Sequence, residues 1–200
     1  MLYRQKWLAL CSAMTAGLFA LVSGTPALAQ SAPWPNKPVR IVVPFPAGGT
    51  TDVVARLLGQ RLQDVWGQSV LVENKTGAGG NIGATEVAKA ANDGYTLVMA
   101  SGSIVTVNPH IYAKMPFDAA KDFAPITNVA QGPMVIVVGP NVPAKNIAEF
   151  IVMAKAKPGQ MNFGSAGIGS QVHMAGENFL YSAGIDLKHV PYKGESLPLP

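Results

Sequence analysis

The chain has 200 residues, of which 48% are hydrophobic, enough to form the core of one or two domains. Its formal charge is +4, but the lysines and arginines form no runs or clusters, so the composition does not support nucleic-acid binding. The sequence therefore indicates a globular protein whose partners are not nucleic acids.

Residues 1–29 have the pattern of a secretory signal peptide. Two basic residues precede an apolar run over 7–22, and the small residues of 27–29 mark a cleavage site. We expect a mature chain from Gln30 and a periplasmic location, because the run is short for a retained membrane anchor. Cleavage would remove the only cysteine, Cys11, and leave 13 of the 15 basic residues against 11 acidic ones. The exported domain would then have no disulfide, cysteine-ligated metal or thiol nucleophile.

The first half of the mature chain is organised around residues 39–52, where a β-branched run meets a Pro/Gly turn and then a helical pattern. This pattern predicts a buried strand at 39–43, a tight loop, and an amphipathic helix that ends at Gly67. The later elements of this half are predicted as a strand at 69–73, a glycine-rich loop at 74–81, a helix at 82–91 capped by Asn81, a strand at 95–100 and a polar loop at 101–110. Alternating strands and helices predict a parallel sheet with these loops at the carboxyl ends of its strands.

The second half repeats the pattern of a strand followed by a Gly/Ser loop and a helix. After a weakly patterned stretch at 111–133, expected to connect two domains, the predicted elements are a strand at 134–138, a helix at 146–157, a strand at 161–163, a loop at 164–170, a helix at 171–183 and a strand at 187–190. We therefore predict an α/β fold of two lobes, with parallel-rich sheets and flanking helices. The first lobe would cover 30–125, and the second, incomplete lobe would cover 126–200.

Glycine-rich loops at helix N-termini can hold an anion, because unpaired N–H groups and the helix dipole both present positive charge. The loop before Asp52 is either such an anion cradle or a simple bend. Asp52 either complements the helix dipole or accepts a hydrogen bond from a ligand. A nucleotide is disfavoured, because residues 77–83 miss the G-x-G-x-x-G register at Ile82 and no acidic residue expected to bind a ribose follows at the usual spacing. Hydroxyl-rich loops with few ionisable groups suit binding of a small anion better than proton transfer.

A secreted hydrolase is a second hypothesis, with Ser165 or Ser170 as nucleophile and His173 as base. No G-x-S-x-G elbow surrounds either serine, and no orienting acid is evident. A helix cap at Ser170, with His173 in the first turn, is the simpler interpretation. His110 in a loop and His189 in a strand add no metal-ligand spacing, so we expect neither a metal site nor an enzyme.

Several segments together resemble the periplasmic receptors of tripartite tricarboxylate transporters, also called the Bug receptor family. The matching segments are PNKPVRIVVPFPAGGTTD at 35–52, VENKTGAGGNIG at 72–83, DGYTL at 93–97, NP at 108–109, FGSAGIGS at 163–170 with His173, and VPYKG at 190–194. The resemblance implies a two-lobed periplasmic binding protein of the class II type. Such a protein delivers small carboxylates to a membrane carrier with one large and one small integral subunit.

Carried onto this chain, the resemblance implies ligand contacts from both lobes. The first lobe would contribute Phe45, Ala47, Gly48, Gly49, Asp52, Ser101 and Thr106, and the second lobe Ser165, Gly167, Ser170 and His173. Ordered water holds part of the carboxylate in the family, which would explain the absence of a loop arginine. The ligand would be a dicarboxylate, a tricarboxylate or an acidic amino acid, bound by a monomer that needs no cofactor.

The resemblance also implies a longer chain, because family members continue for well over a hundred residues and complete the second lobe. Residues 195–200 are interpreted as an unrelated tail, so we expect a C-terminally truncated protein. A fragment that binds no ligand is therefore a third hypothesis. The residues do not identify the ligand, because loops from both lobes would set the size and charge of the pocket.

Overall fold

The computed structural model describes residues 33–194, so the predicted signal peptide and the predicted tail lie outside the described residues. Residues 35–194 belong to one compact unit. The predicted division at 125/126 therefore stays a prediction. Within 33–194, no helix has both the length and the apolar character needed to cross a membrane.

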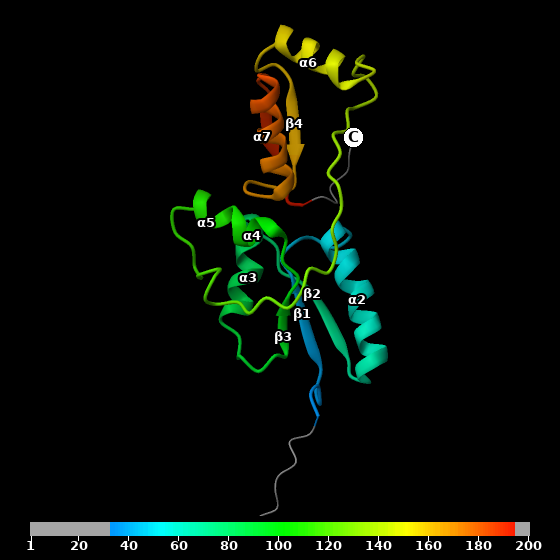
Figure 1. Cartoon of the computed structure of the whole chain (residues 1–200), viewed down its shortest axis with the longest axis vertical. Coiled ribbons are helices and arrows are strands. Elements are labelled where there is room, and N and C mark those ends of the chain that lie inside the picture. The colour runs from blue at the N-terminus through cyan, green and yellow to red at the C-terminus, as the bar shows by residue number, and fades with distance from the viewer. Residues whose placement is uncertain (1–32, 195–200) are drawn as a thin grey trace, which may run out of the picture. The chain divides into compact units, whose positions relative to one another are not determined.

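The first sheet contains three parallel strands, β1 (Val39–Val43), β2 (Val70–Asn74) and β3 (Thr96–Val98), with β1 in the centre (Figure 1). Ile41 lies opposite Val72 on one side and Leu97 on the other. The apolar residues of β1 are between 0 and 2% exposed. The β-branched run thus forms the buried central strand that its composition predicts.

The helical elements of the first half are α2 (Thr50–Trp66), the 3-10 turn η1 (Ala78–Gly80), α3 (Asn81–Ala88), α4 (Gly102–Thr106) and α5 (Asn108–Ile111). Helices α2 and α3 pack against the sheet. Helix α2 ends as predicted, because Gly67 adopts the left-handed conformation with φ of 62° and donates its N–H to Gln63 O. At Gly59 the helix approaches β2 so closely that an added Cβ would lie 3.3 Å from the side chain of Val70.

Two local predictions in this half are wrong. Asn81 does not cap α3, because Gly80 occupies the cap position and the Asn81 side chain instead accepts a hydrogen bond from Asn108 Nδ2 at 2.8 Å. The stretch 101–110 is not one loop but the two short helices α4 and α5, so His110 is helical. The conformation of the Asn81 side chain is decided by its contact with Asn108, which is distant in sequence. Helices α4 and α5 are too short to show a periodicity in the sequence.

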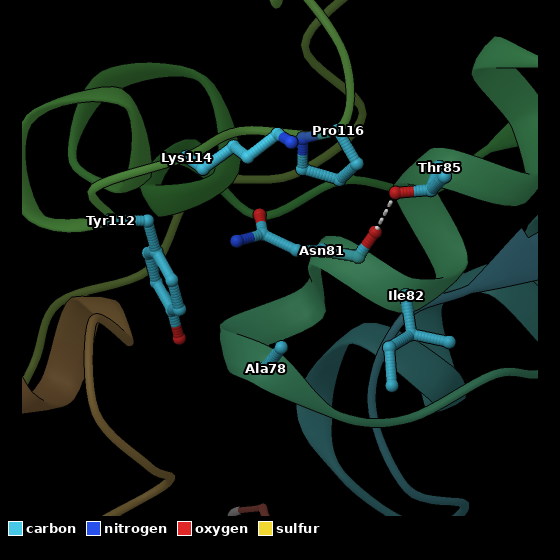
Figure 2. Close-up of a pocket in the computed structure, with 7 residues that line it drawn as sticks. All are labelled: Ala78, Asn81, Ile82, Thr85, Tyr112, Lys114 and Pro116. Carbon is cyan, nitrogen blue, oxygen red and sulfur yellow. Dashed lines mark hydrogen bonds between the residues drawn. The ribbon is translucent and has the colours of Figure 1, made fainter.

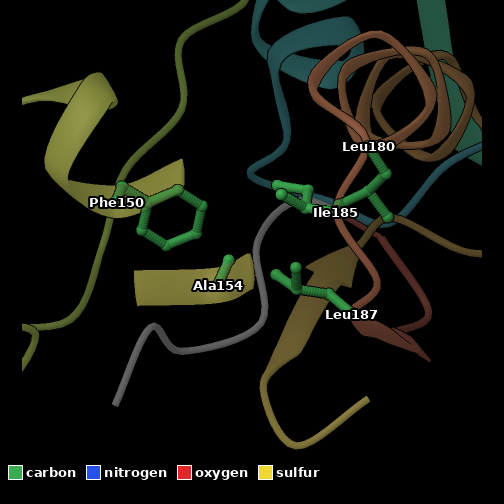
Figure 3. Close-up of a cluster of buried hydrophobic side chains, with 5 residues drawn as sticks. All are labelled: Phe150, Ala154, Leu180, Ile185 and Leu187. Atoms are coloured by element: carbon green, nitrogen blue, oxygen red, sulfur yellow. The ribbon is translucent and has the colours of Figure 1, made fainter. Parts of the chain in front are cut away.

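The second sheet contains two parallel strands, β4 (Asn162–Ser165) and β5 (Lys188–Pro191), with helices α6 (Ile147–Ala156) and α7 (Gln171–Ala183). Helix α6 begins at Asn146, whose side chain accepts from Glu149 N. Helix α7 has the predicted bounds and ends at Gly184 in the left-handed conformation. The core of this half is a cluster of apolar side chains from α6, α7 and the approach to β5, shown in Figure 3: Phe150, Ala154, Leu180, Ile185 and Leu187.

Residues 134–138 do not form the predicted strand. The segment has no regular secondary structure, and its five apolar side chains are between 46 and 76% exposed. A β-branched composition favours a strand only where a neighbouring strand supplies hydrogen bonds and covers one face. No strand within 33–194 pairs with this segment.

Substituting two isoleucines by alanine separates a buried position from an exposed one. Ile41→Ala should lower the free energy of unfolding by about 2–5 kcal/mol, because it removes a buried side chain from the central strand and leaves a cavity. Ile136→Ala should change it by no more than about 0.5 kcal/mol, because this side chain is 55% exposed. Urea denaturation of both variants measures the difference. A loss at position 136 as large as that at position 41 would show that the segment is buried in solution.

Candidate functional site

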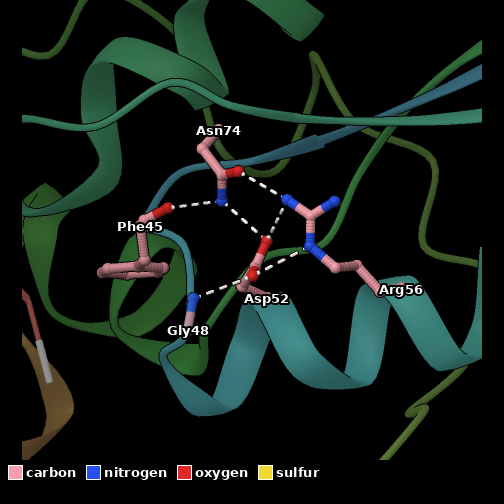
Figure 4. Close-up of polar contacts among 5 residues, drawn as sticks. All are labelled: Phe45, Gly48, Asp52, Arg56 and Asn74. Carbon is pink, nitrogen blue, oxygen red and sulfur yellow. Dashed lines mark hydrogen bonds and ion pairs between the residues drawn. The ribbon is translucent and has the colours of Figure 1, made fainter. Parts of the chain in front are cut away.

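The carboxylate of Asp52 lies at the start of α2 and joins three segments of the first sheet (Figure 4). The residue is 2% exposed, and its oxygens accept hydrogen bonds from Gly48 N at 2.9 Å, Asn74 Nδ2 at 2.8 Å and Arg56 Nε at 3.0 Å. Arg56 also donates to Asn74 Oδ1 at 2.9 Å, and Asn74 donates to Phe45 O at 3.0 Å. The network therefore connects the loop after β1, the first turns of α2 and the end of β2.

Burial alone would raise the pKa of Asp52, but hydrogen bonds from Arg56, Gly48 and Asn74 outweigh it and lower the pKa to about 2. The carboxylate is therefore charged at neutral pH, in the helix turn where a negative charge complements the dipole. Because its hydrogen-bond partners lie within the chain, the structure favours the interpretation that Asp52 complements the helix dipole. A contact from Asp52 to a ligand stays a prediction.

The remaining residues of the loop after β1 differ in exposure. Phe45 is half-buried and packs against the apolar cluster that contains Ile104, whereas Ala47 and Gly48 are exposed and Gly49 is buried. Only Gly48 of the two glycines has a positive φ, at 82°. Its N–H donates to Asp52 and that of Gly49 donates to Pro46 O at 3.4 Å, so the expectation of unpaired N–H groups is wrong at both positions. The anion held by the Gly48 N–H is the protein's own carboxylate.

Ser101 and Thr106 flank the short helix α4. Ser101 is half-buried at the N-cap, and its Oγ lies 2.7 Å from Oγ of the buried Ser103. Thr106 is exposed, and its hydroxyl donates to Gly102 O at 2.9 Å within the same helix. Ser101 and Ser103 therefore form a pair of hydroxyl groups after β3. The hydroxyl proton of Thr106, in contrast, is donated to the backbone of its own helix.

The second-sheet residues predicted from the motif lie together at the end of β4 and the start of α7. Ser170 is the N-cap of α7 and accepts from His173 N at 3.2 Å, which confirms the predicted cap. Gly167 N donates to Ser165 Oγ at 3.2 Å. Ser165 Oγ also lies 2.6 Å from Nε2 of His189, and the His173 and His189 rings stack with centroids 3.9 Å apart.

His189 is the functional candidate that the sequence interpretation missed. Its pairing partner Phe163 is two residues before Ser165, so the strand register brings its ring to the loop after β4. The three histidines had been treated as scattered, yet two of them are in contact. The sequence analysis predicted strands at 161–163 and 187–190, but it gave neither their pairing nor the register of that pairing.

A further hollow of about 320 Å³ opens beside the second glycine loop (Figure 2). Its wall combines η1 and α3 with the segment after α5, and its lining residues are Ala78, Asn81, Ile82, Thr85, Tyr112, Lys114 and Pro116. Burial raises the pKa of Tyr112. Three of the seven lining residues lie in the stretch 111–133, which was expected only to connect domains, so sequence patterning gave no indication of this pocket.

No group of three or more residues suited to bind a metal occurs within the described range 33–194.

The candidate site consists of two sets of polar loops, each at the carboxyl ends of parallel strands. This α/β arrangement is the one found in periplasmic binding proteins. The structure of Rpa4515 from R. palustris with adipate matches with a TM-score of 0.79 and 38% identity, over 80% of this chain and 54% of that one.

Three further comparisons agree with this match. MatC from Rhodopseudomonas palustris with bound malate has a TM-score of 0.71 and 31% identity, over 80% of this chain and 55% of that one. Protein BugT of Bordetella pertussis is 38% identical over 179 residues, which are 89% of this chain and 55% of BugT. A model of the tripartite tricarboxylate transporter family receptors matches residues 54–199. The chain belongs to this family, as its motifs predict.

The comparisons also correct two hypotheses. The family match continues to residue 199, so the interpretation of 195–200 as an unrelated tail is wrong for nearly all of that segment. The family consists of receptors, which overturns the hydrolase hypothesis, and Ser170 is bonded to the backbone of His173 rather than to its ring. The chain spans about half the length of the relatives that it matches.

Asp52→Asn should destabilise the fold by about 2 kcal/mol at pH 7, because the ionised carboxylate is bonded in the folded state and its folded pKa is below the unfolded value. The wild-type contribution is present above the unfolded pKa of 3.8 and is lost as the pH falls toward the folded value of about 2. Urea denaturation across this pH range measures both effects. Asp64→Asn, on the same helix with a side chain 61% exposed, is the matched control and should cost little. Equal losses from both variants would contradict a special role for Asp52.

Proposed function

We propose that this protein is a periplasmic solute receptor that binds a small carboxylate for a tripartite tricarboxylate-type transporter. The ligand class comprises dicarboxylates, tricarboxylates and acidic amino acids. The receptor acts as a monomer and passes its ligand to the membrane subunits of the transporter. Closure around the ligand follows if the ligand binds the closed state more tightly than the open one.

The observation that carries this proposal is the likeness to receptor structures with carboxylates. Rpa4515 has adipate and MatC has malate, and both align with four fifths of this chain at 31% identity or more. Adipate and malate share two carboxylates on a short carbon skeleton. A ligand of this chemistry fits a family of receptors for tripartite tricarboxylate transporters.

The polar chemistry of the loops supports recognition through hydroxyl groups. The N–H groups of Gly48 and Gly167 already donate to side chains of their own loops. Serine hydroxyls keep a donor even while they accept, and Ser101 and Ser170 are placed at the starts of helices. We propose that such hydroxyls, together with bridging waters, hold the carboxylate.

A thermal shift measurement with the purified chain tests this function. Adipate or malate at about 100 times Kd should stabilise the folded state by about 2.7 kcal/mol, because the ligand binds only that state. The diamides of the same acids are the matched controls and should give no shift, because they lack the charge. A panel of dicarboxylates, tricarboxylates and acidic amino acids that leaves the melting temperature unchanged would reject the proposal.

Export should remove residues 1–29, since the small residues at 27 and 29 fit the signal peptidase. Mass spectrometry of the protein from a periplasmic fraction should find Gln30 at the N-terminus. Ala29→Trp should block cleavage, whereas a small residue, as in Ala29→Ser, should preserve it. An uncleaved chain in the wild type would contradict the assignment of a signal peptide.

A further inference from the structure

The aromatic cluster at the end of the second sheet holds two imidazole rings in contact. His189 of β5 stacks on His173 of α7 with ring centroids 3.9 Å apart and planes inclined by 21°. Its ring also lies 4.8 Å from the ring of Phe163 on β4. Aromatic rings on α7 and β4 therefore hold the His189 ring in place. The polar contact of this ring is the one between its Nε2 and Ser165 Oγ.

Both ring nitrogens of His173 lie near polar atoms. Gly169 N donates to His173 Nδ1 at 3.2 Å. Nε2 faces Glu177 Oε1 at 3.5 Å. These contacts hold the His173 ring in place as the stacked neighbour of His189.

The contact between His189 and Ser165 can exist in two forms. Nε2 and Oγ are 2.6 Å apart, whereas the other acceptor near the hydroxyl, Gly167 O, is 3.3 Å away. When His189 is neutral with its proton on Nδ1, Ser165 donates its single proton to Nε2. When His189 is protonated, Nε2–H donates to Oγ, and the hydroxyl proton becomes available to another acceptor.

The surroundings of His189 oppose its protonation in the ligand-free protein. Burial, and then the neighbouring His173, lower the pKa of His189, whereas the Glu177 carboxylate raises it only in part. Strand β4 contributes Phe163 and Ser165 but no charged side chain, and the adjacent Lys188 of β5 alternates to the opposite face. A second negative charge near Ser165 would supply the missing counter-charge.

We infer that His189 is a positioning residue for carboxylate binding: it takes up a proton when the carboxylate arrives, and so turns the Ser165 hydroxyl toward the ligand. The proton comes from solvent and binds to Nε2 of His189. This N–H then donates to Ser165 Oγ, and the Ser165 hydroxyl donates to the ligand carboxylate. No covalent bond to carbon forms or breaks. This inference rests on the proposed function and adds to it a coupling between ligand and proton. Ser165 retains 7% of its surface exposed for the contact.

Calorimetry of adipate and malate binding to the full chain tests the coupling. Between about pH 8 and pH 5.5 the affinity should rise by up to about tenfold per pH unit, the limit for linkage to one proton. Buffers with different ionisation enthalpies should report uptake of up to one proton for each ligand bound. His189→Gln should lose the pH dependence, so that the ratio of its affinities at pH 5.5 and pH 8 falls to about one. His110→Gln, on the exposed face of α5, is the matched control and should keep it.

Nitrogen NMR of the histidine rings gives a second readout in the wild-type protein, independent of how the variants fold. Saturating adipate at about pH 7 should convert the His189 ring from neutral to protonated. Binding without proton uptake, or a His189 ring that stays neutral in the complex, overturns this inference and leaves the proposed function standing. Absence of binding at every pH rejects the proposed function and the coupling together.

Discussion

The buried carboxylate of Asp52 is the interaction on which the functional edge of the first sheet depends. A charge removed from water must be compensated by hydrogen bonds, and here the compensation comes from Gly48, Asn74 and Arg56. These partners fix the path of the loop after β1 relative to β2 and α2. Because the chain itself supplies the anion for this loop, the Gly48 N–H is paired without a ligand.

Local signals in the sequence predicted the elements that depend on local interactions. Ser170 and Gly184 bound α7 at the predicted residues, because a side-chain cap and a left-handed glycine act within one helical turn. The run at 39–43 and the run at 134–138 have similar composition, yet only the first is a strand. The run at 39–43 is a strand because it pairs with strands that are distant in sequence. The residues within each run do not show whether such pairing occurs.

The candidate site shows the same limit. The family motif indicated the loop residues, but it did not show in which direction their donors point, and the Gly48 N–H donates to Asp52 in the first turn of α2. His189 was recognised as a strand residue but not as a partner of Ser165 and His173. Its contribution arises from strand register, helix packing and ring stacking together. The sequence therefore predicted candidate residues for the site but not the hydrogen bonds that these residues make.

The exposed run at 134–138 has a consequence beyond the chain itself. Its residues are apolar, uncharged and free of proline, and their side chains are 46% exposed or more. Such a segment can add as a strand to the same segment of another molecule, with backbone hydrogen bonds between chains and side chains interlocked. The colloidal behaviour of this protein thus depends on its concentration as well as on its folding stability.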